Sequence, residues 1–311
     1  MGKMAIRLKN LFDQAIQEKV ISLKAMSEAK KMAAENLKSM PSADKLIEDE
    51  RDPLHAIYAN TLNLISVFGE QATTLPPLHP IHDFITKWQD TYVPGLPPWS
   101  PVSNSYFTCW TMLDAAFGED RETIGTCFLS LVDRLPLNPI QIEVARNLNQ
   151  SRMGIYEVLQ IKGQLFQLRE LITDKKLTAF ICSGYVGSVG DLIFVRLVPP
   201  LANSVDYFVG LTTPYQCVQQ SEENWLQYFK RHDVTSKTVG VEARLHRHLK
   251  YGKNRTYWSE YIFYGYSNFG PGVILLAGFP DQPNTQPQHD KYQESAKRVR
   301  GGQHASGFPV G

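Results

Sequence analysis

The hydrophobic pattern divides the chain into a first half with helical periodicity and a second half with short strand-like runs. From about residue 4 to residue 40, apolar residues recur every three or four positions among strong helix formers, and no proline interrupts them. This spacing predicts one long amphipathic helix. Asp52 and Pro53 form a typical helix start. Further helices are expected at residues 53–68, 81–92, 106–117, 120–135 and 139–150, so that the region 1–150 is predicted to be all-helical.

The helical spacing of apolar residues ends near Gly154, where short runs rich in β-branched and aromatic residues begin. Turn residues such as Lys162-Gly163 and Pro199-Pro200 separate these runs. Strands at a spacing of about ten residues are typical of a small antiparallel β barrel or meander, which we place at residues 151–220. The expected strands lie within residues 155–163, 164–172, 176–184, 191–199 and 205–213.

Residues 221–280 predict a mixed, aromatic-rich segment. Ser221 is placed to cap a helix over 221–232, and Gly252 to end a short helix over 244–250. Residues 273–279 have the composition of a strand, and the polar residues 281–311 predict a disordered tail. The predicted fold class is therefore α+β, with a helical N-terminal half, a small antiparallel β barrel or meander and the mixed segment.

Composition and charge narrow the classes of protein. The net charge of +1 argues against a protein that coats nucleic acid, although residues 221–280 carry a local excess of +3. The four cysteines form no C-x-x-C pair, which argues against a structural zinc site, and their apolar surroundings are typical of buried thiols in a reducing compartment. The N-terminus lacks the apolar core of a signal peptide, and no run approaches the length of a membrane span. We therefore predict a cytoplasmic protein with no membrane partner.

The segment 244–269 is the main candidate for function, because basic and imidazole side chains precede a group of aromatic ones. Aromatic faces beside cations stack bases and neutralise phosphates, which predicts nucleic-acid binding. The same composition also builds an ordinary core whose Tyr hydroxyls reach the surface. A base-stacking surface requires that the basic and aromatic side chains converge. The residues assigned to this interface are Arg247, Lys250, Lys253, Arg255, Tyr257, Trp258 and Tyr261.

Motifs of catalysis are not evident in the sequence. The chain has no G-x-S-x-G or S-x-x-K motif, so any enzymatic site would be dispersed, with His246, His248 or Asp191 as the first residues to consider. The glycine cluster 184–191 lacks the Gly-Lys-Ser/Thr of a phosphate-binding loop and predicts sharp turns, with Asp191 as a turn cap. We expect no cofactor and no metal site.

Four strings of the second half form a recurring pattern: YEVLQIKG, GDLIFVRLVPP, TTPY and YGKNRTYWSEYIF…LAGFPD. The pattern resembles uncharacterised bacterial proteins in which a short β module with a G-D-L strand follows a helical region. The resemblance covers roughly residues 154–282 and implies no reaction, cofactor or site residue.

Three hypotheses about function follow. The leading one is a cytoplasmic non-enzymatic interaction or adaptor protein, whose partner is another protein or a second copy bound through the predicted helix 4–40. The second is nucleic-acid binding through the β module and residues 244–269. The third is an enzyme whose dispersed or metal-containing site leaves no local motif.

Overall fold

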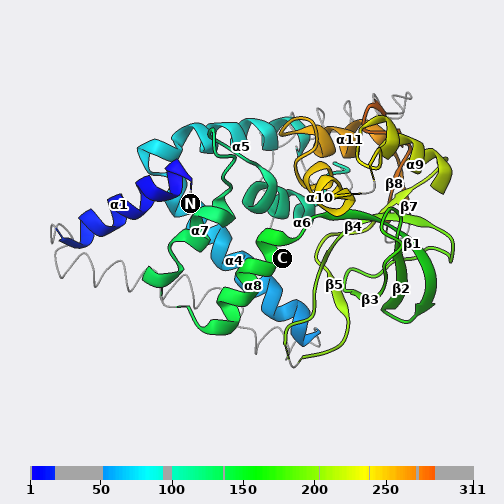
Figure 1. The fold of residues 1–311 in the computed structure, drawn as a ribbon, viewed down its shortest axis with the longest axis horizontal. Coiled ribbons are helices and arrows are strands. Elements are labelled where there is room, and N and C mark those ends of the chain that lie inside the picture. The colour runs from blue at the N-terminus through cyan, green and yellow to red at the C-terminus, as the bar shows by residue number, and fades with distance from the viewer. Residues whose placement is uncertain are drawn as a thin grey trace, which may run out of the picture. The chain divides into compact units, whose positions relative to one another are not determined.

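The computed structural model describes residues 2–17, 52–93, 100–135, 137–202, 204–237, 239–270 and 273–283 of the chain. These residues belong to two compact units (Figure 1). Unit 1 comprises Met1–Ile81, Cys109–Ser151 and Val198–Asp206, and unit 2 comprises His82–Thr108, Arg152–Leu197 and Tyr207–Gly311. Residues 18–40 of the predicted long helix and residues 284–311 of the predicted tail lie outside the described residues.

Unit 1 is helical, as the first half of the sequence predicts. The Asp52 carboxylate accepts a hydrogen bond from the backbone N–H of His55 at 2.9 Å, so the predicted cap is confirmed. Asn138 and Gln141 form a reciprocal capping box at the start of another helix. The main helices are α1 (Lys3–Gln17), α4 (Pro53–Thr73), α7 (Ile124–Ser130) and α8 (Pro139–Gln150), with α4 packed against α8.

The predicted helix over 120–135 is wrong at both ends. Phe117 and Glu122 exchange backbone hydrogen bonds across a tight turn, so the chain is not helical there, and Thr123 caps α7. After Ser130 the backbone tightens into a short 3₁₀ turn, Val132–Arg134. Glu122 has a tertiary contact that local periodicity does not report, because its carboxylate meets the first turn of α1.

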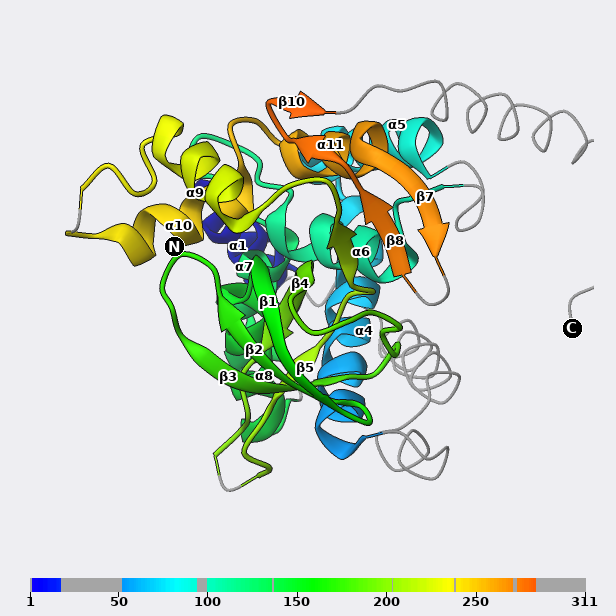
Figure 2. The ribbon, with the colours of Figure 1, turned by 90° about the vertical axis from the view of Figure 1, so that its right-hand side faces the viewer.

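Unit 2 contains the β barrel that the second half of the sequence predicts, which confirms the α+β class (Figure 2). Its five strands follow the order β1-β2-β3-β5-β4, and β1 also pairs with β4, which closes the barrel. The pairing of β3 with β5 is parallel, whereas β1 pairs antiparallel with both β2 and β4. The strands are β1 (Met153–Lys162), β2 (Leu165–Glu170), β3 (Lys176–Ile181), β4 (Leu192–Val198) and β5 (Phe208–Gly210).

Further strands extend the sheet from β4. The strand predicted over 273–279 is interrupted at Ala277, whose N–H bonds to the carbonyl of Gly265 instead of continuing the ladder. Figure 2 shows β7 and β8 side by side next to α11 (Tyr257–Gly265). These strands are β6 (Tyr215–Cys217), β7 (Tyr266–Gly270), β8 (Val273–Leu276), β9 (Gly278–Phe279) and β10 (Gln282–Pro283).

Residues 82–108 belong to unit 2 although they lie within the predicted helical region 1–150. The reason is aromatic packing: Trp88 stacks on Phe107 at 5.2 Å between ring centroids, and Tyr92 meets Phe263 edge to face at 5.2 Å. The helix predicted over 106–117 is shorter, because α6 (Asn104–Cys109) passes into a π-helical turn at Trp110–Asp114. The remaining helices are α5 (His79–Tyr92), α9 (Glu222–Arg231) and α10 (Val241–Tyr251).

Candidate functional site

The structure buries the aromatic rings that the sequence assigns to a nucleic-acid interface. Tyr257, Trp258 and Tyr261 lie on α11 and are 7%, 4% and 1% exposed. Trp258 packs on Phe194 of the barrel strand β4, with ring centroids 5.0 Å apart. Stacking on a base requires an open ring face. These three rings therefore belong to the core of unit 2. The base-stacking surface predicted from the sequence would need them at the surface, so these rings do not support it.

The four basic residues of the predicted interface differ in burial and in the groups that they contact. Lys250 is only 5% exposed and its Nζ lies 5.7 Å from the ring centroid of Tyr251. The exposed Arg255 places its guanidinium 4.5 Å from the ring centroid of Phe84 on α5, and partial burial lowers the pKa of this Arg. Arg247 on α10 and Lys253 after it are exposed. Two of the four cations thus pack against aromatic rings of unit 2.

Several residues of the segment meet instead around His248 on α10. Its Nε2 lies 2.8 Å from the hydroxyl of Tyr228 on α9, which lies 2.9 Å from the hydroxyl of Tyr257. The indole N–H of Trp258 donates to the His248 carbonyl at 2.8 Å. A second imidazole, His232, stacks on His248 with ring centroids 5.6 Å apart and an interplanar angle of 23°. We call Tyr228, His232, His248, Tyr257 and Asp281 the histidine cluster.

Asp281 connects the histidine cluster to the last described strands. It accepts two hydrogen bonds from the guanidinium of Arg231, at 2.7 and 2.8 Å, and its Oδ2 lies 2.9 Å from His232 Nε2. Burial acts to raise the pKa of Asp281, but the hydrogen bonds from Arg231 and His232 outweigh it and the pKa is lowered. Asp281 is therefore an anion between two donors.

Burial also sets the protonation of the cluster's other members. It lowers the pKa of His248 to about 4, with the neighbouring His232 and Lys253 acting in the same direction. It lowers the pKa of His232 despite the bond to Asp281, and it raises the pKa of Tyr257 to about 12. Both imidazoles are thus neutral at pH 7. Hydrogen bonds thus join Tyr228 to His248 and Tyr257, and His232 to Asp281, within the cluster.

Asp191, which the sequence analysis considers for a dispersed catalytic site, caps a turn in the structure. Its Oδ2 accepts hydrogen bonds from the backbone N–H of Ser188 at 2.6 Å and from the hydroxyl of Tyr185 at 2.7 Å. Tyr185 in turn packs edge to face on Phe166 inside the barrel. The glycine cluster therefore forms a turn that Asp191 caps, as the sequence predicts. Within the described parts of the chain, no set of three or more His, Cys, Asp or Glu side chains is arranged to hold a metal ion.

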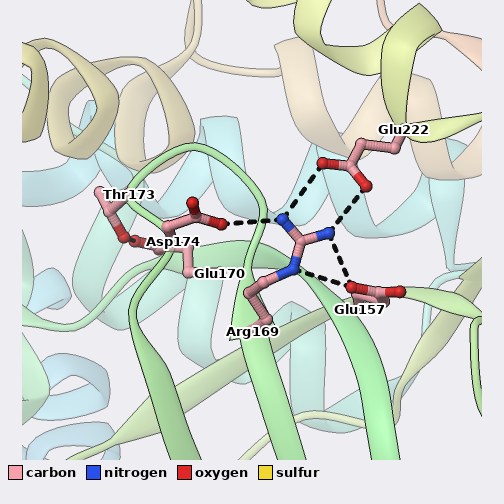
Figure 3. Close-up of polar contacts among 6 residues, drawn as sticks. All are labelled: Glu157, Arg169, Glu170, Thr173, Asp174 and Glu222. Atoms are coloured by element: carbon pink, nitrogen blue, oxygen red, sulfur yellow. Dashed lines mark hydrogen bonds and ion pairs between the residues drawn. The ribbon is translucent and has the colours of Figure 1, made fainter.

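A second polar cluster surrounds Arg169 on β2 (Figure 3). Its guanidinium bonds to three carboxylates, those of Glu157 on β1, Asp174 in the β2–β3 turn and Glu222 at the start of α9, with N–O distances of 2.7 to 3.2 Å. These hydrogen bonds raise the pKa of Arg169. The neighbouring Glu170 accepts from Thr173 in the same turn. Arg169 thus connects two barrel strands, a turn and a helix.

Unit 1 presents a different kind of site, an open apolar groove of about 300 Å³ between α1 and the C-terminal part of α4. Leu8 and Ala72 form its buried floor, whereas Leu11 and Leu75 are more than a third exposed. Gln71 is its one polar lining residue. The groove is lined by Leu8, Leu11, Phe68, Gln71, Ala72, Leu75 and Leu131.

The position of α1, which forms one wall of this groove, depends on acidic residues from the turn before α7. The buried Glu122 accepts hydrogen bonds from the backbone N–H groups of Met4 and Ala5 at 2.8 and 2.9 Å. Asp120 accepts from the N–H of Lys3 at 2.7 Å. The first N–H groups of a helix have no partner within it, and the helix dipole favours an anion there. Glu122 therefore caps α1 across a long separation in sequence, which local sequence patterns could not reveal.

Comparisons with known proteins add no identification: no protein-family model, no curated protein and no solved structure matches this chain. None of the described helices has the length and apolar character needed to cross a membrane.

Proposed function

We propose that this chain is a non-enzymatic interaction or adaptor protein that binds an amphipathic helix of a partner protein in the apolar groove of unit 1. The single observation that supports the proposal is the groove itself, an apolar surface in which the exposed Leu11 and Leu75 lie beside the buried Leu8 and Ala72. The groove includes Leu8 and Leu11, which lie in the helix that the sequence assigns to partner binding.

The spacing of the lining residues favours a helix as the occupant. On α1 the groove uses residues three apart, Leu8 and Leu11, and on α4 and its end it uses Phe68, Ala72 and Leu75. These positions form ridges along two helices, and the furrow between two such ridges accepts the apolar residues of a third helix at i, i+3 or i+4, and i+7. From Phe68 to Leu75 the furrow is about 10 Å long at 1.5 Å per residue, which matches two turns of a partner helix.

Two exposed aliphatic residues on α1, one inside the groove and one outside it, provide a matched test. Leu11 lines the groove and is 39% exposed, whereas Ile6 on the same helix is 46% exposed and is not among the lining residues. With a fluorescein-labelled amphipathic peptide carrying leucine at i, i+3, i+4 and i+7, Leu11→Glu should raise the Kd at least about tenfold, because a carboxylate would enter an apolar contact. Ile6→Glu should leave the Kd within about twofold of the wild type. Fluorescence anisotropy measures both.

A scrambled peptide of the same composition is the control for non-specific binding, and circular dichroism checks that both variants are folded. Equal binding of the two peptides, or equal loss in both variants, would contradict the proposal. Sedimentation of the wild type and Leu11→Glu without peptide identifies a second copy as the occupant if only the wild type self-associates.

We further propose the cytoplasm as the compartment, since the four cysteines are free thiols and three of them are buried.

Nucleic-acid binding has less support, because the rings and Lys250 that it requires at the surface lie in the core of unit 2. Filter binding of single-stranded RNA at two salt concentrations tests it, since phosphate contacts produce an affinity that falls steeply with salt. We expect no salt-dependent binding.

A further inference from the structure

The stacked imidazoles of the histidine cluster join three parts of unit 2 that are far apart in sequence. His232 ends α9, His248 lies in the last turn of α10, and Asp281 lies between β9 and β10. The two rings are nearly parallel at 5.6 Å, so a proton on either ring places a positive charge against the face of the other. The stacked arrangement is therefore most favourable while both rings are neutral.

The charges around the pair make a proton on His248 unfavourable. From α9, Arg231 lies beside the pair, and from the connection after α10, Lys253 acts on both rings. The C-terminal strands contribute one carboxylate, Asp281, which Arg231 already binds twice. Tyr228 on α9 and Tyr257 on α11 face His248 as neutral hydroxyls. Two cations and one anion therefore surround the two rings before either takes up a proton.

We propose that His248 and His232 form a pH-sensitive contact that holds α10 against α9 while both rings are neutral and releases α10 when His248 is protonated. The contact lies in unit 2 and is independent of the groove in unit 1. Its direction follows from linkage. The pKa of His248 in the folded protein, about 4, is below the usual 6.5, so its contribution to stability is complete above pH 6.5 and is lost as the pH falls toward 4.

Hydrogen exchange of the full-length protein at pH 6.5 and pH 5.0, with each rate divided by the intrinsic exchange rate at that pH, measures the release directly. We expect the opening constant of peptides from α10 to rise roughly tenfold at pH 5.0, from the uptake of one proton by the open state. Peptides from α8 in unit 1 serve as the internal control and should change less. An equal rise in both helices would overturn the proposal.

His248→Gln, which keeps a polar partner for Tyr228, should abolish the rise in α10. His82→Gln is the matched control, because His82 is an exposed histidine of the same unit, and it should leave the rise intact. Ring NMR signals of the wild type provide a measurement that needs no variant: at least one of the eight histidines should remain neutral at pH 5.5. The proposal fails if all eight rings are protonated at that pH, or if His248→Gln keeps the wild-type rise.

Discussion

Glu122→Ala is expected to lower the free energy of unfolding by about 3 kcal/mol, because two charge-assisted hydrogen bonds are lost and the N–H groups of Met4 and Ala5 remain without their acceptor. The Glu122 side chain is 6% exposed, so water cannot fully replace it at the start of α1. Urea denaturation followed by circular dichroism measures the loss. Because α1 forms one wall of the groove, the same variant should also bind the amphipathic peptide more weakly.

Glu119 provides the matched control for this prediction. It lies in the same turn and its carboxylate contacts Lys3 of the same helix, but both side chains are largely exposed. Glu119→Ala should therefore cost less than about 1 kcal/mol. Glu122→Gln, which keeps one acceptor oxygen, should fall between the two. If Glu119→Ala and Glu122→Ala destabilise the protein equally, buried capping of α1 is not what holds the helix.

Arg169→Met should lower the free energy of unfolding by about 2 kcal/mol, since three carboxylates lose their common donor and then repel one another. Arg169 is mostly buried, whereas Asp174 is exposed and Glu222 partly so, which keeps the loss below that of a fully buried pair. Urea denaturation at low and high salt measures it. The loss should shrink at about 1 M salt, where repulsion among the three acids is screened.

Two further variants test the geometry of this cluster. Arg169→Lys keeps the charge but not the planar fork that reaches three acceptors, so it should recover only part of the stability. Lys175→Met removes the exposed ion pair of Lys175 with Glu242 and should leave the free energy of unfolding close to that of the wild type. Equal stability of Arg169→Met and the wild type would show that the carboxylates are solvated well enough without the guanidinium.

Helix and strand positions with local signals could be predicted well from the sequence. The helix over 139–150 has the predicted bounds, because Asn138 and Pro139 specify its start within a few residues. Ser221 caps α9, as the sequence predicts, and the structure shows that Asn224 completes its capping box. All five barrel strands lie in or next to the expected runs, since turn residues separate these runs along the chain.

The segment 257–266 shows where local patterns are insufficient. Its aromatic residues fit one face of a helix or both faces of a strand, and only the structure distinguishes the two, with α11 ending at Gly265 and β7 beginning at Tyr266. The local sequence pattern also does not determine whether these rings are buried or exposed. A Tyr or Trp side chain suits a core and a binding surface alike, so what packs against it decides its role.

By itself, the sequence determined the α+β class, the helical first half, the barrel strands and the local caps, because each depends on residues a few positions apart. The tertiary structure alone decided that Glu122 caps α1, that His248 meets His232 and Asp281, and that an apolar groove lies between α1 and α4. These arrangements join residues separated by long stretches of chain. Their side chains come together only when the units fold, and no periodicity or spacing in the sequence encodes that contact.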